Sequence, residues 1–452
     1  MPVPRLTSQA KSTQATQDNI HRKPLVVHCV PDNNMGGINV ALTHLCASSL
    51  ANDVDMRMVC LPMQLNSRLN LNADIICFHG AASWLALLGM AKLKLAHPNA
   101  KFILQEHHYS PAFVREQIVH PWRFLTLLKC TYALVDNVIA ISASQQAWML
   151  SKQLLSVEKV FMLGQGRDLS RFFERPVTMV NTFVDADIDA EIDKKCASTP
   201  SSVVALPSGL AADVKPERAP MFESGTIDLT IASAKPVNET TPPCETANNG
   251  QHRQNTANHH RPIQLLAYGR FHRQKGFDVL LKAMQLVPAS LCQLTLVGQG
   301  EEAAHLEQIA ITMKHVQILP AVADIKPMLI TADAVVVPSR WEPFGLIMQE
   351  ALAMNKPVIT SGVDGLGDQL INAPVKCHQF AVLTAQDIAA TIIGFCQNEL
   401  IDNVDNMPNR AVNSNEHHNT SPRVDTTQQL WAQQQWQQVV QQWQQLLTTL
   451  LR

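Results

Sequence analysis

Long apolar runs are missing from this sequence. No uninterrupted apolar stretch in its 452 residues approaches the roughly 20 residues that a membrane-spanning helix needs. The N-terminal stretch MPVPRLTSQAKSTQATQDN also lacks the apolar core of a signal peptide. The ten cysteines form no Cys-x-x-Cys pair, which argues against a zinc ribbon or thioredoxin-like chemistry. We therefore expect a cytoplasmic protein with reduced thiols, either free or peripheral on the inner face of the cytoplasmic membrane.

An excess of charge of either sign is missing as well. The chain has 36 basic and 38 acidic residues and a formal net charge of -2. This balance argues against a protein that coats nucleic acid, so we expect no nucleic-acid partner. The hydrophobic share of 46% is that of a globular protein that can bury one or two large cores.

Short apolar runs alternate with helical patterns along most of the chain. Residues 21–173 contain six such runs, at 25–30, 56–61, 73–78, 101–105, 137–142 and 159–163. A second series follows in 261–398, at 263–269, 293–298, 316–319, 334–339, 357–361 and 379–383. Alternation of this kind predicts an α/β fold with two doubly wound, Rossmann-like domains, each built on a parallel sheet.

The remaining segments are polar or carry a different pattern. Residues 1–20, 174–260 and 399–425 are poor in apolar periodicity, and we interpret them as a disordered N-terminus, a long low-order insertion and a polar linker. In 426–452, by contrast, Trp436, Val440, Trp443 and Leu447 recur at helical spacing. This pattern predicts a C-terminal amphipathic helix. A glutamine-rich aggregation segment is the alternative.

Two cations follow the first strand of the second series. Arg270 and Lys275 lie in YGRFHRQKGF, between the predicted strand 263–269 and a helix. Ligands of doubly wound sheets bind at the carboxyl ends of the strands, and this pair suits a diphosphate there. A solvated turn with two surface cations is the alternative.

Two glutamates and a helix start follow a later strand. Glu342 and Glu350 flank Phe344-Gly345-Leu346, where we expect a helix to begin. Free backbone N–H groups at such a start can hold phosphate or sugar oxygens. Carboxylates accept hydrogen bonds from paired hydroxyls, so the two glutamates suit a sugar and a ribose. An N-terminal helix charge and a surface residue are the alternative.

This second half resembles the family 4 glycosyltransferases, also called glycosyl transferases group 1, which have the GT-B fold. The matching motifs are Pro338-Ser339, Glu342-Pro343-Phe344-Gly345, Glu350-Ala351, Pro357-Val358, Gly269-Arg270 with Lys275-Gly276, and Val297-Gly298-Gln299-Gly300. Residues 24–173 match more loosely. Two departures stand out, namely Gln165-Gly166-Arg167-Asp168 in place of Asn-Gly-x-Asp, and the long insertion at 174–260.

The resemblance implies an enzyme that takes a sugar from a nucleoside-diphosphate donor in a cleft between its two domains. It implies retention of anomeric configuration, with no metal ion and no cofactor. Arg270 and Lys275 would stabilise the leaving diphosphate, Glu350 would hold the ribose, and Glu342 would hold the transferred sugar. The donor site would also include Gly269, Gly298, Phe344, Gly345 and Leu346.

The first domain contributes a glycine turn and a histidine to the same implied site. Gly36 and Gly37 follow the first strand, where the family has a glycine loop near the donor phosphates, although a simple tight turn explains them equally well. His107 ends the strand that begins near residue 101, and the resemblance places it at the reacting sugar. A structural histidine is the alternative.

The acceptor is less specified by the sequence. In this family the first domain often binds it, and a glycan or a lipid-linked glycan is the partner that the resemblance implies. Residues 110–130 mix basic and aromatic side chains and are a candidate for peripheral contact with an anionic membrane. An ordinary half-buried helix is the alternative.

Three other functions compete with sugar transfer. A non-catalytic GT-B scaffold and a GT-B sugar-nucleotide epimerase would share the fold. A nicotinamide-dependent oxidoreductase would need Gly-x-Gly-x-x-Gly after the first strand, where this chain has only Gly36-Gly37.

Overall fold

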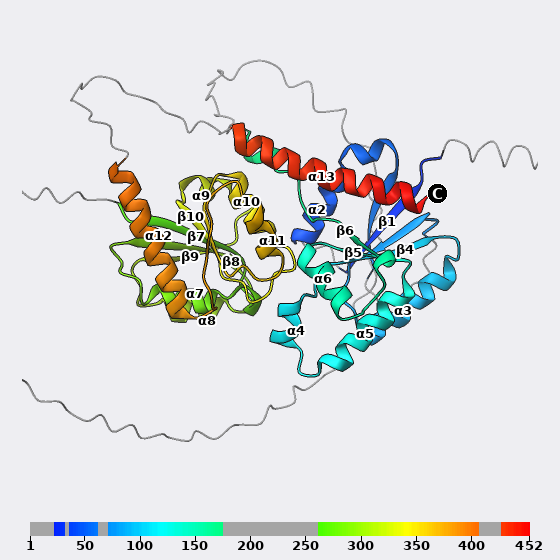
Figure 1. Ribbon diagram of the computed structural model, residues 1–452, viewed down its shortest axis with the longest axis horizontal. Coiled ribbons are helices and arrows are strands. Elements are labelled where there is room, and N and C mark those ends of the chain that lie inside the picture. The colour runs from blue at the N-terminus through cyan, green and yellow to red at the C-terminus, as the bar shows by residue number, and fades with distance from the viewer. Residues whose placement is uncertain (1–21, 32–35, 62–70, 175–260, 406–425) are drawn as a thin grey trace, which may run out of the picture. The chain divides into compact units, whose positions relative to one another are not determined.

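A computed structural model describes residues 22–31, 36–61, 71–174, 261–405 and 426–452 (Figure 1). The predicted N-terminal disordered segment, nearly all of the insertion 174–260 and most of the linker 399–425 lie outside the described residues. In the described part of the chain, no helix is long and apolar enough to cross a bilayer.

The N-terminal lobe is built on a six-stranded parallel sheet with the strand order β2-β1-β3-β4-β5-β6. Its elements are β1 (Leu25–Val30), α2 (Gly37–Cys46), η1 (Ser49–Asn52), β2 (Asp55–Cys60), β3 (Ile75–Phe78), α3 (Trp84–Ala96), β4 (Lys101–Glu106), α4 (Pro111–Gln117), α5 (Pro121–Leu134), β5 (Asn137–Ala140), α6 (Ala143–Ser151), η2 (Val157–Lys159), β6 (Val160–Met162) and η3 (Ser170–Phe172). Every residue of β1 and β3 is buried, because helices cover both faces of the sheet.

The C-terminal lobe repeats this architecture with the strand order β12-β11-β10-β7-β8-β9, again all parallel. Its elements are β7 (Ile263–Arg270), η4 (Arg273–Lys275), α7 (Phe277–Met284), β8 (Cys292–Gln299), α8 (Ala303–Ala310), β9 (Val316–Pro320), α9 (Lys326–Thr331), β10 (Ala334–Val337), α10 (Leu346–Ala353), β11 (Val358–Thr360), α11 (Gly365–Ile371), β12 (His378–Gln379) and α12 (Ala385–Asp405). The predicted fold class is confirmed. The last strand, which was predicted at 379–383, is observed as β12, which is shorter and begins one residue earlier.

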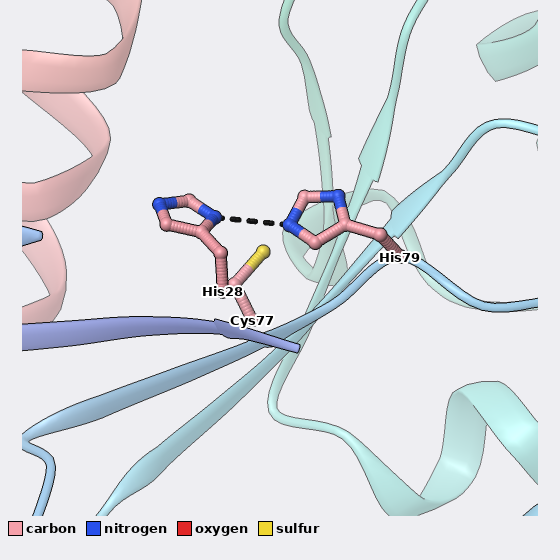
Figure 2. A group of neighbouring side chains, drawn as sticks. All are labelled: His28, Cys77 and His79. Atoms are coloured by element: carbon pink, nitrogen blue, oxygen red, sulfur yellow. Dashed lines mark hydrogen bonds between the residues drawn. The ribbon is translucent and has the colours of Figure 1, made fainter. Parts of the chain in front are cut away.

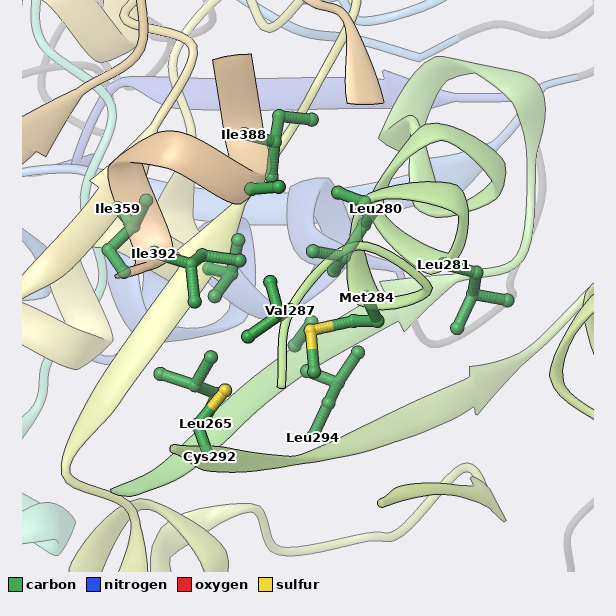
Figure 3. Packing of buried hydrophobic residues seen from close by; sticks show 14 of the residues in the cluster. Leu265, Leu280, Leu281, Met284, Val287, Cys292, Leu294, Ile359, Ile388 and Ile392 are labelled. Atoms are coloured by element: carbon green, nitrogen blue, oxygen red, sulfur yellow. The ribbon is translucent and has the colours of Figure 1, made fainter. Parts of the chain in front are cut away.

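Each sheet separates two apolar clusters. In the C-terminal lobe, one face packs against α7, α8 and α12. Figure 3 shows the contributions of α7 and α12 to this packing. The opposite face packs against α9, α10 and α11. In the N-terminal lobe, α3, α5 and α6 cover one face. Two apolar layers per sheet explain why the central strands read as continuous hydrophobic runs in the sequence.

The last helix, α13 (Thr426–Leu450), packs on the N-terminal sheet although it follows the C-terminal lobe in the chain. Val440, Trp443 and Leu447 are buried with residues of β1, β3 and α2. Trp443 is only 2% exposed. The apolar stripe of the predicted amphipathic helix therefore completes the second face of the first sheet.

Candidate active site at the strand ends

The turn after β7 carries the two predicted cations. Gly269 and Gly276 have φ angles of +136° and +67°, in the region that favours glycine. A Cβ at Gly276 would lie 2.0 Å from the Pro338 carbonyl oxygen, so this turn passes directly against the end of β10. Arg270 is exposed at the tip of β7, with its guanidinium 3.5 Å from Gln274 Oε1. The turn thus presents one exposed cation and brings the second toward the loop after β10.

Lys275 and Glu342 form a close ion pair between these two segments. The Nζ–Oε2 distance is 2.5 Å, and the side chains are only 15% and 11% exposed. Ser339 Oγ donates to the same carboxylate oxygen at 3.0 Å. One of the predicted diphosphate cations and one of the predicted sugar-binding carboxylates are therefore in direct contact, although 67 positions separate them in the sequence.

The start of α10 lies at this pair. Gly345 is the N-cap, with φ +98°, and it provides no side-chain hydrogen bond to the first turn. Gln369 Nε2 donates to the Phe344 carbonyl at 2.6 Å and holds this segment on α11. A Cβ added to Gly37, at the start of α2, would lie 3.1 Å from Leu346 Cδ1. The glycine turn of the first lobe thus faces the helix start of the second, whereas Gly36 beside it faces open space.

Glu350 lies deeper, on the buried face of α10. Its carboxylate accepts a hydrogen bond from Tyr268 Oη at 2.8 Å and pairs with Arg167 at 2.9 Å. Burial raises the pKa of Glu350, while the Arg167 charge and the tyrosine hydroxyl oppose that shift. Arg167 is 19% exposed and comes from the loop after β6, so this ion pair joins the two lobes. The sequence analysis named Arg167 only as part of the segment Gln165-Gly166-Arg167-Asp168, which departs from the family pattern.

Asp364 is a site residue that the sequence motifs did not indicate. Its carboxylate accepts hydrogen bonds from Ser110 Oγ at 2.6 Å, the Ala112 amide at 3.2 Å and the Glu342 amide at 3.1 Å. Its backbone has φ +50° and ψ -127°, a strained conformation for a residue with a side chain. Burial raises the pKa of Asp364, against hydrogen bonds that lower it. The carboxylate of this residue with a strained backbone thus links the Glu342 loop to the start of α4.

A second carboxylate, on α11 itself, acts in the same way. Asp368 accepts a hydrogen bond from the Ser144 amide at 2.8 Å, in the first turn of α6. Both aspartates therefore lie at N-termini of helices in the first lobe, where a helix dipole favours negative charge.

His107 and Gly298 have other neighbours than the residues of the Lys275–Glu342 ion pair. His107 Nε2 is 2.9 Å from His79 Nδ1, and burial together with the His108 charge lowers its pKa to about 3. The ring is thus neutral and tied to the sheet face that α13 covers. Gly298 pairs with Gly269 in the sheet, and a Cβ there would lie 2.0 Å from the Gly269 carbonyl oxygen. Close packing of two strands therefore accounts for a glycine at position 298.

Comparison with known proteins finds sequence relatives of the second lobe. Residues 262–398 match the model of the family "Glycosyl transferases group 1". Glycogen synthase of Mycobacterium tuberculosis is 34% identical over 121 residues, which are 25% of this chain and 28% of that protein. The lipopolysaccharide core biosynthesis glycosyltransferase LpsE of Rhizobium meliloti is 31% identical over 104 residues, 22% of this chain and 30% of that protein. The chain thus spans less than a third of the length of these relatives.

Solved structures resemble the whole fold. HepE of Anabaena, crystallised with UDP and glucose, superposes with a TM-score of 0.55 at 15% identity, covering 95% of this chain and 99% of HepE. Sucrose-phosphate synthase of Thermosynechococcus elongatus superposes with a TM-score of 0.58 at 19% identity, covering 95% of this chain and 99% of that protein. The fold is therefore GT-B, and residues 262–398 are similar in sequence to the glycosyl transferases group 1 family.

Proposed function

We propose that this protein is a retaining glycosyltransferase that moves a sugar from a nucleoside-diphosphate donor to an acceptor, without a metal ion or cofactor in the reaction. The observation that carries the proposal is the Lys275–Glu342 pair beside the uncapped start of α10. A cation, a carboxylate and free backbone N–H groups at one point suit a ligand that has both phosphates and hydroxyls. The crystal structure of HepE with UDP and glucose supports a nucleotide-sugar donor on this fold.

In this proposal Arg270 and Lys275 bind the diphosphate. Arg270 is exposed at the strand tip, and its guanidinium can form paired hydrogen bonds to phosphate oxygens. As the sugar–phosphate bond breaks, negative charge grows on the leaving oxygen, and fixed cations stabilise it. Phe344, Gly345 and Leu346 contribute backbone N–H groups, with Gly36, Gly37, Gly269 and Gly298 lining the donor site.

The two glutamates hold the hydroxyl-bearing ends of the donor. Glu342 would accept hydrogen bonds from the transferred sugar and Glu350 from the ribose. A carboxylate has about four acceptor positions, so Glu350 can keep Tyr268 and still accept from a ribose hydroxyl. His107, neutral because of its burial, would contact the sugar from the first lobe.

The donor test combines binding with turnover. Ligands that bind only the folded protein raise its unfolding temperature, so UDP-, GDP- and ADP-sugars are compared by thermal shift. The stabilising donor is then used in an assay of nucleoside-diphosphate release. Lys275→Ala should abolish release while the protein stays folded, and Lys282→Ala, an exposed lysine on α7, should leave it unchanged. A Lys275→Ala variant with normal turnover would favour the non-catalytic scaffold, and donor epimerisation without transfer would favour the epimerase.

For the acceptor we propose a glycan or lipid-linked glycan, as in a lipopolysaccharide or polysaccharide, reached at an anionic membrane surface through residues 110–130. Val119 and Trp122 in this segment are 86% and 70% exposed, which suits insertion of side chains between headgroups. Co-sedimentation with phosphatidylglycerol vesicles should fall with salt and with Trp122→Ser. Equal sedimentation of the variant and the wild type would contradict the membrane contact.

A further inference from the structure

Three side chains that can bind metal meet inside the N-terminal sheet. His28 on β1 and Cys77 on β3 are register partners, so their side chains project from the same face. His79 follows Cys77 by two positions and shares that face. All three residues have no exposed surface. In the part of the chain that the structure describes, this is the single group of three or more histidine, cysteine or acidic residues with metal-binding proximity.

The geometry suits a small ion. The three candidate ligand atoms lie within 4.8 Å of one another, and His28 Nδ1 is 2.9 Å from His79 Nε2. Figure 2 shows the Cys77 sulfur beside these two facing nitrogens. Zinc bonds of about 2.0–2.1 Å to nitrogen place two ligand nitrogens about 3.3 Å apart at a tetrahedral angle. The rings would therefore separate by only a few tenths of an ångström to admit the ion.

The three candidate ligand atoms are enclosed in the apolar core. His28 Nε2 is buried and has no hydrogen-bond partner, and its ring stands edge-on to Trp443 at 5.6 Å. Cys77 is a free, buried thiol. Nε2 is the ring nitrogen that does not face His79, so it is no candidate ligand atom; the case for an ion rests on the donor set, two facing imidazole nitrogens and a thiol enclosed in an apolar core.

We propose that His28, Cys77 and His79 bind one thiophilic metal ion, Zn²⁺ or Cu⁺. The donor set of one sulfur and two nitrogens without oxygen disfavours magnesium and calcium. On binding, the Cys77 thiol releases its proton and the thiolate bonds to the ion. The proton between the two rings moves to the outer nitrogen of the ring that carried it, so each imidazole stays neutral.

Metal binding would also determine the tautomer of His107. Once His79 binds the ion through Nε2, its single proton is on Nδ1, which donates to His107 Nε2 at 2.9 Å. His107 must then carry its own proton on Nδ1. Without the ion, the two hydrogen bonds that join His28, His79 and His107 can exchange donor and acceptor together, so His107 can adopt either tautomer. The importance of this tautomer for catalysis rests on the proposed function. Metal binding does not, because it needs no nucleotide-sugar donor.

The test measures bound metal in the full chain. The protein is purified without chelator, exposed to Zn²⁺ or, under reducing anaerobic conditions, to Cu⁺, and desalted before elemental analysis. We expect one equivalent of one of the two ions in the wild type, and a sulfur-to-metal charge-transfer band after loading with Co²⁺ if the site prefers zinc. Nitrogen-15 spectra should show His107 protonated at Nδ1 in the loaded protein.

Two cysteine variants provide the comparison. Cys77→Ala should lose the bound metal and the charge-transfer band, whereas Cys29→Ala should keep both, because Cys29 is a neighbouring buried thiol on the opposite face of the sheet. If Cys77→Ala does not fold, His28→Gln provides the same comparison. Less than a tenth of an equivalent in the loaded wild type, or equal metal in the wild type and a folded Cys77 variant, would overturn the proposal. Neither outcome tests the proposed sugar transfer itself, which is measured separately by nucleoside-diphosphate release.

Discussion

Removal of the Arg167 side chain tests the ion pair that joins the lobes at Glu350. Arg167→Ala leaves the Glu350 carboxylate buried, with the hydrogen bond from Tyr268 still in place. Breaking a buried ion pair by deleting one member costs about 3–5 kcal/mol, because the other charge stays in a low-dielectric site. Arg167 is 19% exposed, so water can partly replace it, and we expect a loss of about 3 kcal/mol near neutral pH.

The loss should depend on pH in a defined direction. Burial raises the folded-state pKa of Glu350 above its unfolded value, so its favourable contribution is complete below the unfolded pKa and is lost as pH rises through the folded pKa. Arg167 opposes this rise, so removing it moves the folded pKa of Glu350 further up. The variant should therefore be close to wild type in stability near pH 4.5 and fall progressively behind it toward pH 7.

Urea unfolding followed by tryptophan fluorescence measures the effect at both ends of this pH range. Arg171→Ala, at an exposed arginine of η3 four residues further along the chain, is the matched control and should change stability by less than about 0.5 kcal/mol. The double variant Arg167→Ala, Glu350→Gln should recover part of the loss, because no buried charge is left unpaired. A loss that is equal at both pH values, or additive in the double variant, would refute the reasoning.

Substitutions at four further positions test local packing and strain. Asp364→Gly and Asp364→Ala both remove the carboxylate, but only glycine relieves the strain of the positive φ angle. The free energy of unfolding of the alanine variant should therefore be about 1–3 kcal/mol lower than that of the glycine variant, and equal melting temperatures would count against strain. Gly298→Ala should destabilise strongly because its Cβ would meet a carbonyl oxygen at 2.0 Å, whereas Gly394→Ala, in open space on a helix, should stabilise by up to about 1 kcal/mol in the same melts. Trp443→Ala should cost about 3–5 kcal/mol in urea unfolding, and a smaller loss would mean that α13 packs only weakly on the first sheet.

Much of the architecture follows from local sequence. Eleven of the twelve predicted strands overlap the observed ones closely, because a strand covered by helices on both faces must be a short continuous apolar run. The glycines at 269, 276 and 345 mark positions with positive φ, which a side chain would strain. The turn cations and the helix start at Leu346 are similarly local features, set by residues within a few positions of each other.

Side-chain partners across the chain were decided by tertiary structure. Arg167 and Glu350 are 183 positions apart, and Ser110 and Asp364 are 254 apart. No periodicity connects such residues, because which side chains meet depends on how the two sheets and their loops come together. Asp364 reads as an ordinary polar loop residue until its φ angle and its three donors are seen.

The contacts among the buried residues His28, His79 and His107 and the position of α13 were also decided by tertiary structure. The spacing of its tryptophans predicts the apolar stripe of α13. It does not predict which surface the stripe covers, because any exposed apolar face of a sheet could bury it. His28, Cys77 and His79 each look like an isolated polar residue in or beside an apolar strand. The sequence by itself thus determined the strands, the turns and the amphipathic faces, which depend on local sterics and burial. Tertiary structure decided which of these elements share a site, because that choice is made by packing between segments that are distant in the chain.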